Sequence, residues 1–319
     1  MLRLGILLSM LAGLSACEPT EGGNALLDDD DSAGDDDDTG DDDDSAASDD
    51  DDDDDTPPPS PFRRMAVGRT QACMTTGGAA QCWQLADPSQ RFNLADIDVV
   101  HLDSAVSADA PLCALNGSGG WSCEPDIADL DTWVGEALNG VYGEFGVAVG
   151  LLCGITTGGD LHCRTSAAAA LGPFPAGPWH GLTVGGGSLC ALDGAGEAAC
   201  WGRNDQGQGS PPAGAFEQIA TNGFTACGVR PGGALECWGI DAEGGLATPP
   251  AGTFSRVAVG FGFACGLTAG GGELNCWGRD IDGELSPPAG AYVEVDLGWG
   301  AGCALPANDD IHCWGSQTM

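Results

Sequence analysis

The sequence predicts an all-β protein, a seven-bladed β-propeller with one disulfide inside each repeat, preceded by a signal peptide and a disordered acidic linker. Two regularities predict this fold. Fourteen cysteines form seven close pairs, and the first members of successive pairs are 37 to 40 residues apart. An aromatic residue or Leu stands eleven positions before the first cysteine of every pair. A period of about 40 residues with short strands is typical of propellers, because one small sheet cannot bury both of its faces alone.

Both markers keep the same phase through seven units, which makes the repeat real even where sequence identity is weak. The pairs are Cys73 and Cys82, Cys113 and Cys123, Cys153 and Cys163, Cys190 and Cys200, Cys227 and Cys237, Cys265 and Cys276, and Cys303 and Cys313. The residues eleven positions earlier are Phe62, Leu102, Tyr142, Trp179, Phe216, Phe254 and Tyr292. The propeller is therefore expected over residues 62–319. An open β-solenoid is the competing architecture, but solenoid coils are shorter and need no fixed repeat number.

Residues 1–16 have the composition of a lipoprotein signal peptide. Arg3 is followed by an apolar run over residues 4–14, too short to span a bilayer, and then by small residues before Cys17. The segment Leu-Ser-Ala-Cys resembles the lipobox of bacterial lipoproteins. That resemblance implies cleavage before Cys17 and attachment of lipid to its thiol, and Cys17 is the odd one of fifteen cysteines. An ordinary signal peptide followed by an incidental cysteine is the alternative.

Residues 17–61 are expected to be a disordered acidic and proline-rich tether. Nineteen aspartates form the runs 28–31, 35–38, 41–44 and 49–55, so the segment has little apolar surface to bury. Binding of Ca²⁺ by these runs is conceivable, but no fixed geometry is implied. The rest of the chain is acidic too, and the whole has a net charge of −38. Nucleic acid is therefore excluded as a partner, because its binding requires many Lys and Arg side chains.

The sixth repeat shows the expected unit most clearly. Val257 and Val259 alternate with Arg256 and Ala258 in a half-buried strand, and residues 264–268 and 274–277 form a hairpin closed by glycines. Each cysteine pair lies on neighbouring strands of such a hairpin, where opposed Cβ atoms satisfy disulfide geometry. Zinc is the rival interpretation, but the ligands of zinc sites are usually two to four residues apart, and these cysteines are nine to eleven apart.

The fourth repeat carries the residues of a family resemblance. Its Cys-Ala-Leu from Cys190 and its Cys-Trp-Gly-Arg-Asn-Asp-Gln-Gly-Gln from Cys200 resemble the regulator of chromosome condensation repeat, and most closely its secreted bacterial branch, which includes a β-lactamase-inhibiting propeller. The resemblance covers residues 62–319 and is strong in repeats four to seven. Repeats two and three depart from it, since Cys123 and Cys163 are not followed by Trp-Gly. It implies a seven-bladed propeller with a protein-binding surface, and it does not identify the partner.

The sequence offers no catalytic constellation, cofactor motif or metal-ligand spacing, and we expect none of these. His162 and His312 occupy the same place in two repeats and are expected to be solvated side chains. The repeated tryptophans are expected to be packing residues rather than a binding platform. Binding candidates are instead the tryptophans that break the repeat, because Trp dominates binding energy at interfaces. These candidates are Trp121, Trp133 and Trp299.

These observations favour a non-catalytic, membrane-tethered module that recognises a protein or a glycan outside the cytoplasm. It is expected to be a monomer of the cell envelope, lipid-anchored on the outer membrane and facing the periplasm or the surface. The alternative is a propeller enzyme, such as a lyase or a glycan hydrolase, with its site at the channel mouth.

The two ends of the propeller are expected to meet. Repeats four to six end in Pro-Pro-Ala-Gly, whereas the seventh ends at Met319 without that segment. A similar proline-rich stretch stands just before Phe62. We therefore expect residues near 56–69 to lie against the final repeat and to close the ring, because closure removes exposed strand edges.

Overall fold

The computed structural model describes residues 65–76, 79–93, 99–104, 112–116, 121–124, 141–148, 150–165, 171, 173–241, 245–307 and 311–316. The described residues all belong to the unit Pro57–Met319. The expected signal peptide, Cys17 and the acidic tether lie outside the described residues. No helix within the described ranges is long and apolar enough to cross a membrane.

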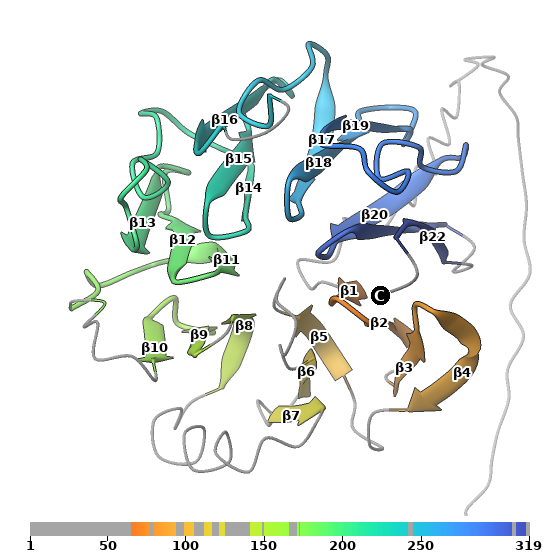
Figure 1. Ribbon diagram of the computed structural model, residues 1–319. Helices are drawn as coiled ribbons and strands as arrows, with labels where there is room; N and C mark the ends of the chain where they lie inside the picture. The colour runs from red at the N-terminus through yellow and green to blue at the C-terminus, as the bar shows by residue number, and fades with distance from the viewer. Residues whose placement is uncertain are drawn as a thin grey trace, which may run out of the picture. The chain divides into compact units, whose positions relative to one another are not determined.

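The described residues form small antiparallel sheets, each built from strands consecutive in the chain (Figure 1). The first sheet contains β1 (Met65–Val67), β2 (Gln71–Thr76), β3 (Ala79–Gln84) and β4 (Asp87–Asn93). The next two contain β5 (Val99–Ser104), β6 (Leu112–Asn116) and β7 (Trp121–Glu124), and β8 (Tyr142–Ala148), β9 (Leu151–Thr156) and β10 (Leu161–Thr165). The following two contain β11 (His180–Gly185), β12 (Ser188–Leu192) and β13 (Ala198–Gly202), and β14 (Gln218–Thr221), β15 (Thr225–Val229) and β16 (Leu235–Gly239). The last two contain β17 (Phe254–Val259), β18 (Phe263–Thr268) and β19 (Leu274–Gly278), and β20 (Tyr292–Leu297), β21 (Ala301–Pro306) and β22 (His312–Gly315).

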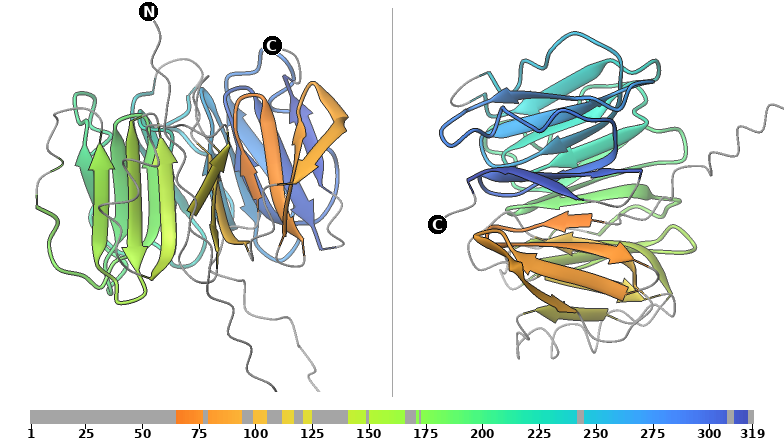
Figure 2. Two further views of the ribbon diagram at one scale, coloured as in Figure 1. Left: turned by 90° about the horizontal axis from the view of Figure 1, so that it is seen from below. Right: turned by 90° about the vertical axis from the view of Figure 1, so that its right-hand side faces the viewer.

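The first strands of the sheets lie side by side at the centre of the unit Pro57–Met319. They contact one another in the order β1, β5, β8, β11, β14, β17 and β20, and β20 contacts β1 again. Figure 2 shows the sheets from two further directions, with their strands running roughly along one common direction. The all-β class and the propeller-like arrangement predicted from the sequence are confirmed.

A fourth strand is described only in the first sheet. Residues 84–100 follow no repeat pattern in the sequence, yet Asp87–Asn93 forms β4 and pairs with β3. The corresponding segments of repeats four to six contain Pro-Pro-Ala-Gly. Proline alone does not exclude a strand at this place, since Pro88 lies within β4.

Disulfides join the second and third strands of the hairpins, as the spacing predicts. Six bonds are Cys73–Cys82, Cys153–Cys163, Cys190–Cys200, Cys227–Cys237, Cys265–Cys276 and Cys303–Cys313, with Cα–Cα distances of 4.0 to 4.1 Å. Cys113 and Cys123 lie opposite each other in the same register, and the side chain of Cys123 is outside the described residues. Six disulfides indicate a chain that folds in an oxidising compartment.

In repeats three, five and six the aromatic marker packs on a glycine of the neighbouring strand. The rings of Tyr142, Phe216 and Phe254 lie where a Cβ on Gly154, Gly228 or Gly266, respectively, would collide with them. Tyr142, Phe216, Phe254 and Tyr292 are only 2 to 3% exposed. The glycine one residue after the first cysteine therefore creates the space that the ring fills.

The repeated tryptophans join one sheet to the preceding one, and their expected packing role is confirmed. The indole N–H groups of Trp238, Trp277 and Trp314 donate to the carbonyl oxygens of Gln208, Leu246 and Glu284, over 2.8 to 3.0 Å. Each acceptor belongs to the turn that leaves the preceding sheet, about 30 residues earlier in the chain.

Those turns have the Asx geometry that their sequence predicts. The side-chain oxygen of Asn204 accepts from the N–H of Gly209 at 2.9 Å, and Gly207 takes a positive φ of 84°.

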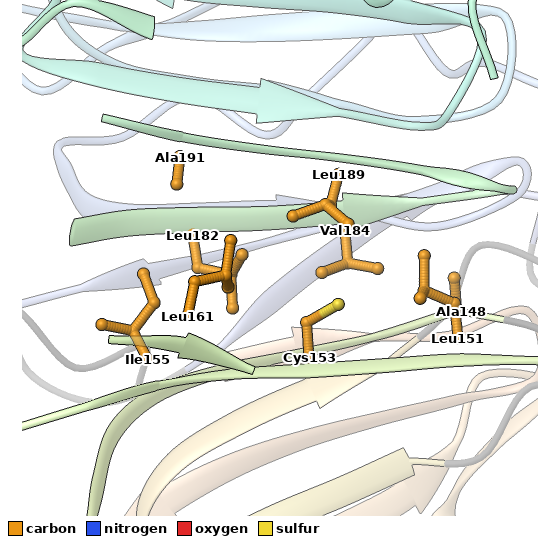
Figure 3. Close-up of a cluster of buried hydrophobic side chains, with 9 residues drawn as sticks. All are labelled: Ala148, Leu151, Cys153, Ile155, Leu161, Leu182, Val184, Leu189 and Ala191. Carbon is orange, nitrogen blue, oxygen red and sulfur yellow. The ribbon is translucent and has the colours of Figure 1, made fainter. Parts of the chain in front are cut away.

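Apolar side chains fill the space between adjacent sheets. Between the third and fourth sheets they come from β8, β9 and β10 on one side and from β11 and β12 on the other (Figure 3). The residues are Ala148, Leu151, Cys153, Ile155, Leu161, Leu182, Val184, Leu189 and Ala191. Burial of such surface is the main favourable term in folding, so each sheet depends on its neighbours.

Polar side chains of one first strand bond to the backbone of the next. The carboxylate of Glu144 accepts from the N–H groups of Gly181 and Leu182, and Gln218 bonds to both the N–H and the carbonyl of Val257. A first strand has a sheet partner on one side only. These side chains therefore satisfy backbone groups that the ladder leaves unpaired.

The same device joins the last sheet to the first. Asp296 accepts from the N–H of Val67 at 2.7 Å, and Glu294 accepts from the N–H of Met65 at 3.3 Å. The expectation that the chain near residue 69 lies against the final repeat is confirmed for Met65–Val67. These residues form the first strand of their own sheet and do not add a strand to the last one, and residues 56–64 lie outside the described residues.

Candidate binding face

An aromatic row lies on the turns that connect the first and second strands of neighbouring sheets. We define it as Phe224, between β14 and β15, Phe261, between β17 and β18, and Trp299, between β20 and β21. All three side chains are half-buried. These turns belong to one end of the strands, because each one follows the end of a first strand.

Glycines allow these turns to approach one another closely. Gly223 has a φ of 91°, and a Cβ at this position would collide with the backbone of Gly186 in the neighbouring turn. The N–H of Phe261 donates to the carbonyl of Gly298 at 3.2 Å, so two of the turns are hydrogen-bonded directly. The approach of the backbones places the aromatic side chains of neighbouring sheets side by side.

Asn222 fixes both the shape and the place of its turn. Its side-chain oxygen accepts from the N–H groups of Phe224 and Thr225, and its amide group donates to the carbonyl of Gly260 at 2.7 Å. The residue is only 5% exposed. A buried polar side chain with all these partners holds Phe224 in a defined orientation.

The rings contact one another in series. Phe261 and Trp299 stack with 3.9 Å between ring centroids and 6° between ring planes. Phe224 and Phe261 meet edge to face at 6.3 Å and 85°. Aromatic pairs in such arrangements contribute about 0.5–1.5 kcal/mol beyond the area they bury. The row is therefore organised by its own contacts.

Three arginines contact the row from above its rings. The guanidinium carbon of Arg203 lies 5.0 Å from the ring centre of Phe224, that of Arg279 lies 5.8 Å from Phe261, and that of Arg69 lies 5.4 Å from Trp299. Only nine arginines follow Arg3 in the chain, and there is no lysine. A third of the basic side chains that follow Arg3 therefore belong to this one surface of a strongly acidic protein.

Arg203 is also paired with a carboxylate. Its Nε and Nη2 atoms donate to the two oxygens of Asp205 at 2.7 and 2.9 Å. This bidentate contact, together with a hydrogen bond from Gln208, lowers the pKa of Asp205 to about 2. The charge of Arg203 is thus balanced locally at neutral pH.

A pocket of about 250 Å³ opens between Phe224 and Phe261. The side chains of Ile240 and Leu246 contribute apolar surface, and Arg279 contributes a cation. The remaining lining residues are Asn222, Thr225 and Gly262. Pockets for drug-sized ligands usually measure about 300–1,000 Å³. This one has the size to admit a single side chain.

The structure includes one of the three predicted binding tryptophans in this face. Trp299 lies in the aromatic row. Trp121 is the first residue of β7, opposite Leu115, and so belongs to a strand rather than to a loop as expected. It takes the hairpin position that Leu161 takes in the third sheet, two residues before the second cysteine. Trp133 lies outside the described residues.

Phe224 and Phe261 were not predicted from the sequence as binding residues. They stand three and four positions before the first cysteines of their repeats, so they do not align with each other. The available signal was the position of Phe261, which stands four residues before the first cysteine of its repeat just as Trp299 does.

Two histidines contact tyrosines in addition to solvent: His162 is exposed, as expected, and His312 is half-buried. The Nδ1 atom of His162 lies 2.8 Å from the hydroxyl of Tyr142, and that of His312 lies 3.0 Å from the hydroxyl of Tyr292. Only the two repeats whose marker residue is Tyr carry His at this position. Burial raises the pKa of both tyrosines above the usual value of 10.0.

The fold resembles known propellers, although no protein-family model and no curated protein sequence matches the chain. The CRINKLY WD40 ectodomain of the Arabidopsis thaliana receptor kinase ACR4 is 21% identical, with a TM-score of 0.63 over 80% of this chain and 95% of that one. The ectodomain of the Physcomitrella patens receptor kinase CR4 is also 21% identical, with a TM-score of 0.57 over 79% of this chain. The match spans 63% of that ectodomain.

A third similar structure is Prp20p of Saccharomyces cerevisiae, which is the yeast RCC1. It is 13% identical, with a TM-score of 0.50 over 79% of this chain and 71% of Prp20p. Together these likenesses show an RCC1-like propeller fold, as the repeat of the fourth unit implies.

Proposed function

We propose that this chain is an extracytoplasmic binding module, a seven-bladed propeller held on a membrane by a lipid at Cys17 and carried on the acidic tether 17–61. The closed contact order of the first strands supports seven blades. The lipobox-like segment before Cys17 supports the anchor, and the six disulfides support export. A bacterial outer membrane is the location we propose.

The observation that carries the proposal is the aromatic row with its three arginines. Turns on a rigid scaffold are common carriers of binding residues, and aromatic and Arg side chains dominate the energy of protein interfaces. The yeast protein Prp20p is described by its binding to Gsp1p and histones, which supports a protein partner for a propeller of this kind. A glycan remains the other class of ligand that such a face can recognise.

The test is a comparison of variants in crosslinking from intact cells that express the full chain. Phe261→Ala combined with Trp299→Ala removes the stacked pair. Val141→Ala is the matched control, since Val141 is 54% exposed and precedes β8 at the opposite end of a first strand. We expect a specific crosslinked species to be lost in the double variant and kept in the control. Equal yields from all three chains would refute the proposal.

A further inference from the structure

The geometry points to a more specific ligand, and the inference rests on the proposed function. We propose that the pocket between Phe224 and Phe261 binds a peptide segment of a partner protein in which an apolar side chain is flanked by a carboxylate. The apolar side chain enters the pocket, and the carboxylate pairs with Arg279.

The ring faces of the aromatic row are covered, which favours a peptide over a glycan as the ligand. A sugar ring binds aromatic residues by lying flat on an open ring face. Here Phe261 and Trp299 cover one face of each other at 3.9 Å. Arg203, Arg279 and Arg69 lie over the rings of Phe224, Phe261 and Trp299, respectively. The covered faces leave ring edges and a side-chain-sized hollow as the binding features. These suit an aliphatic or aromatic side chain.

The lining of the pocket divides into an apolar wall and a cationic rim. Phe224, Ile240, Leu246 and Phe261 supply the apolar wall. Arg279 supplies the cation, and a guanidinium can bind a carboxylate through two parallel N–H groups. Charge complementarity therefore assigns one acidic group to the ligand, next to the group that enters the pocket.

Sequence differences between repeats explain why the pocket lies at this place. Three positions after the second cysteine, the fourth and sixth repeats carry Arg203 and Arg279, whereas the fifth carries Ile240. An arginine in place of Ile240 would put a third charge where the pocket now has an apolar wall. Because the fifth repeat has Ile240 where its neighbours have arginine, the pocket has an apolar wall and a positive charge at one side only.

The experiment measures fluorescence anisotropy of a fluorescein-labelled peptide, Gly-Ser-Glu-Phe-Glu-Ser-Gly, titrated with the mature full chain. Three further peptides replace both Glu by Gln, both Glu by Lys, or Phe by Ala. We expect the acidic Phe peptide to bind at least tenfold more tightly than the other three. Added salt should weaken that binding, because the carboxylate contact is screened.

Protein variants test the named residues. Arg279→Gln should weaken binding of the acidic peptide about tenfold, because it removes the charge and the parallel N–H groups that bind the carboxylate. Arg91→Gln makes the same charge change on β4 and should leave binding unchanged. Ile240→Glu, which places a carboxylate in the pocket, should abolish binding of the acidic peptide. Thermal unfolding of each variant confirms that it is folded.

Three results would overturn the inference. These are equal affinity for the Glu and Gln peptides, equal effects of Arg279→Gln and Arg91→Gln, and no binding of any peptide by folded protein at millimolar concentration. None of these three results bears on the crosslinking test of the proposed function. If the crosslinked species is lost when Phe261 and Trp299 are replaced, the proposed binding function is supported even though the peptide ligand is refuted.

Discussion

At the scale of single residues, the repeat depends on positions where a side chain is missing. A ring enters the space above Gly154, Gly228 and Gly266, and the turn of Gly223 packs on the backbone of the next turn. Such contacts leave no room for even one methyl group. The sequence signal for the first kind of contact is a marker aromatic followed twelve positions later by a glycine, which occurs in repeats three, five and six.

Gly266→Ala should therefore destabilise the protein, whereas Gly271→Ala should not. The Cβ at Gly266 would collide with the ring of Phe254, and overpacking of this kind costs about 1–3 kcal/mol. The Cβ at Gly271, in the hairpin of the same repeat, would meet its nearest atom at 3.7 Å. Denaturant unfolding of both variants with disulfides intact gives the comparison. Equal midpoints would show that the ring moves aside at no cost.

Asp205 should remain ionised to unusually low pH. Its pKa is about 2 in the folded protein and 3.8 without its partners, so the stabilisation is complete above pH 3.8 and is lost as the pH falls through 2. An NMR titration of the side-chain carboxyl carbon measures this value. Arg203→Gln should shift the titration midpoint upward toward 3.8. A midpoint near 3.8 in the unchanged protein would contradict the bidentate pair.

At the scale of strands and sheets, the hydrogen bonds that matter most are those between first strands. Glu144 and Gln218 each serve the strand of the next sheet. The hydrogen bonds between β20 and β1 do the same at the seam, the junction of the last sheet with the first. At that seam, two side chains of the last repeat, Glu294 and Asp296, accept hydrogen bonds from the backbone of the first strand of the first repeat.

Asp296→Ala should therefore lower stability by about 1–3 kcal/mol, because it leaves the buried N–H of Val67 without its acceptor. Glu273→Ala is a suitable control, since Glu273 is an exposed residue of a hairpin. Urea denaturation monitored by tryptophan fluorescence measures the difference. If both variants unfold at one midpoint, the seam does not depend on this contact.

The hairpins and their disulfides were predictable because both follow from local spacing, as in Cys265 to Cys276. The strand β4 was not, since the residues 84–100 follow no repeat and a strand there depends on pairing with β3. The candidate binding face was predictable only at Trp299. Phe224 and Phe261 come together with it because neighbouring sheets meet. Phe261 and Trp299 both stand four positions before the first cysteine of their repeats, so this part of the row leaves a trace in the sequence, whereas Phe224 stands three positions before its cysteine.

At the scale of the whole molecule, the chain combines a propeller with a segment of very different composition. Nineteen aspartates precede Thr56, and the net charge is −38. Like charges at this density favour extension, so the tether is expected to hold the propeller away from an anionic membrane surface. The only membrane anchor that the sequence predicts is the lipid at Cys17.

Cys17→Ser should release the protein from membranes. Without the lipid, an acidic chain has no attraction to anionic head groups, so the variant is expected in the soluble fraction after cell fractionation. The unchanged protein should sediment with membranes and partition into detergent. Continued sedimentation of the variant with membranes would mean that another feature holds it there.

The disulfides also have a consequence for how the chain matures during export. Each cysteine is nine to eleven residues from its partner, whereas the next cysteine along the chain is 27 to 31 residues further on. Closing the shorter loop costs less chain entropy, so proximity alone favours the native pairing. A chain that is threaded through a membrane from its N-terminus can therefore oxidise each hairpin as it emerges. Correct pairing then requires little help from a disulfide isomerase, even with fourteen cysteines to sort.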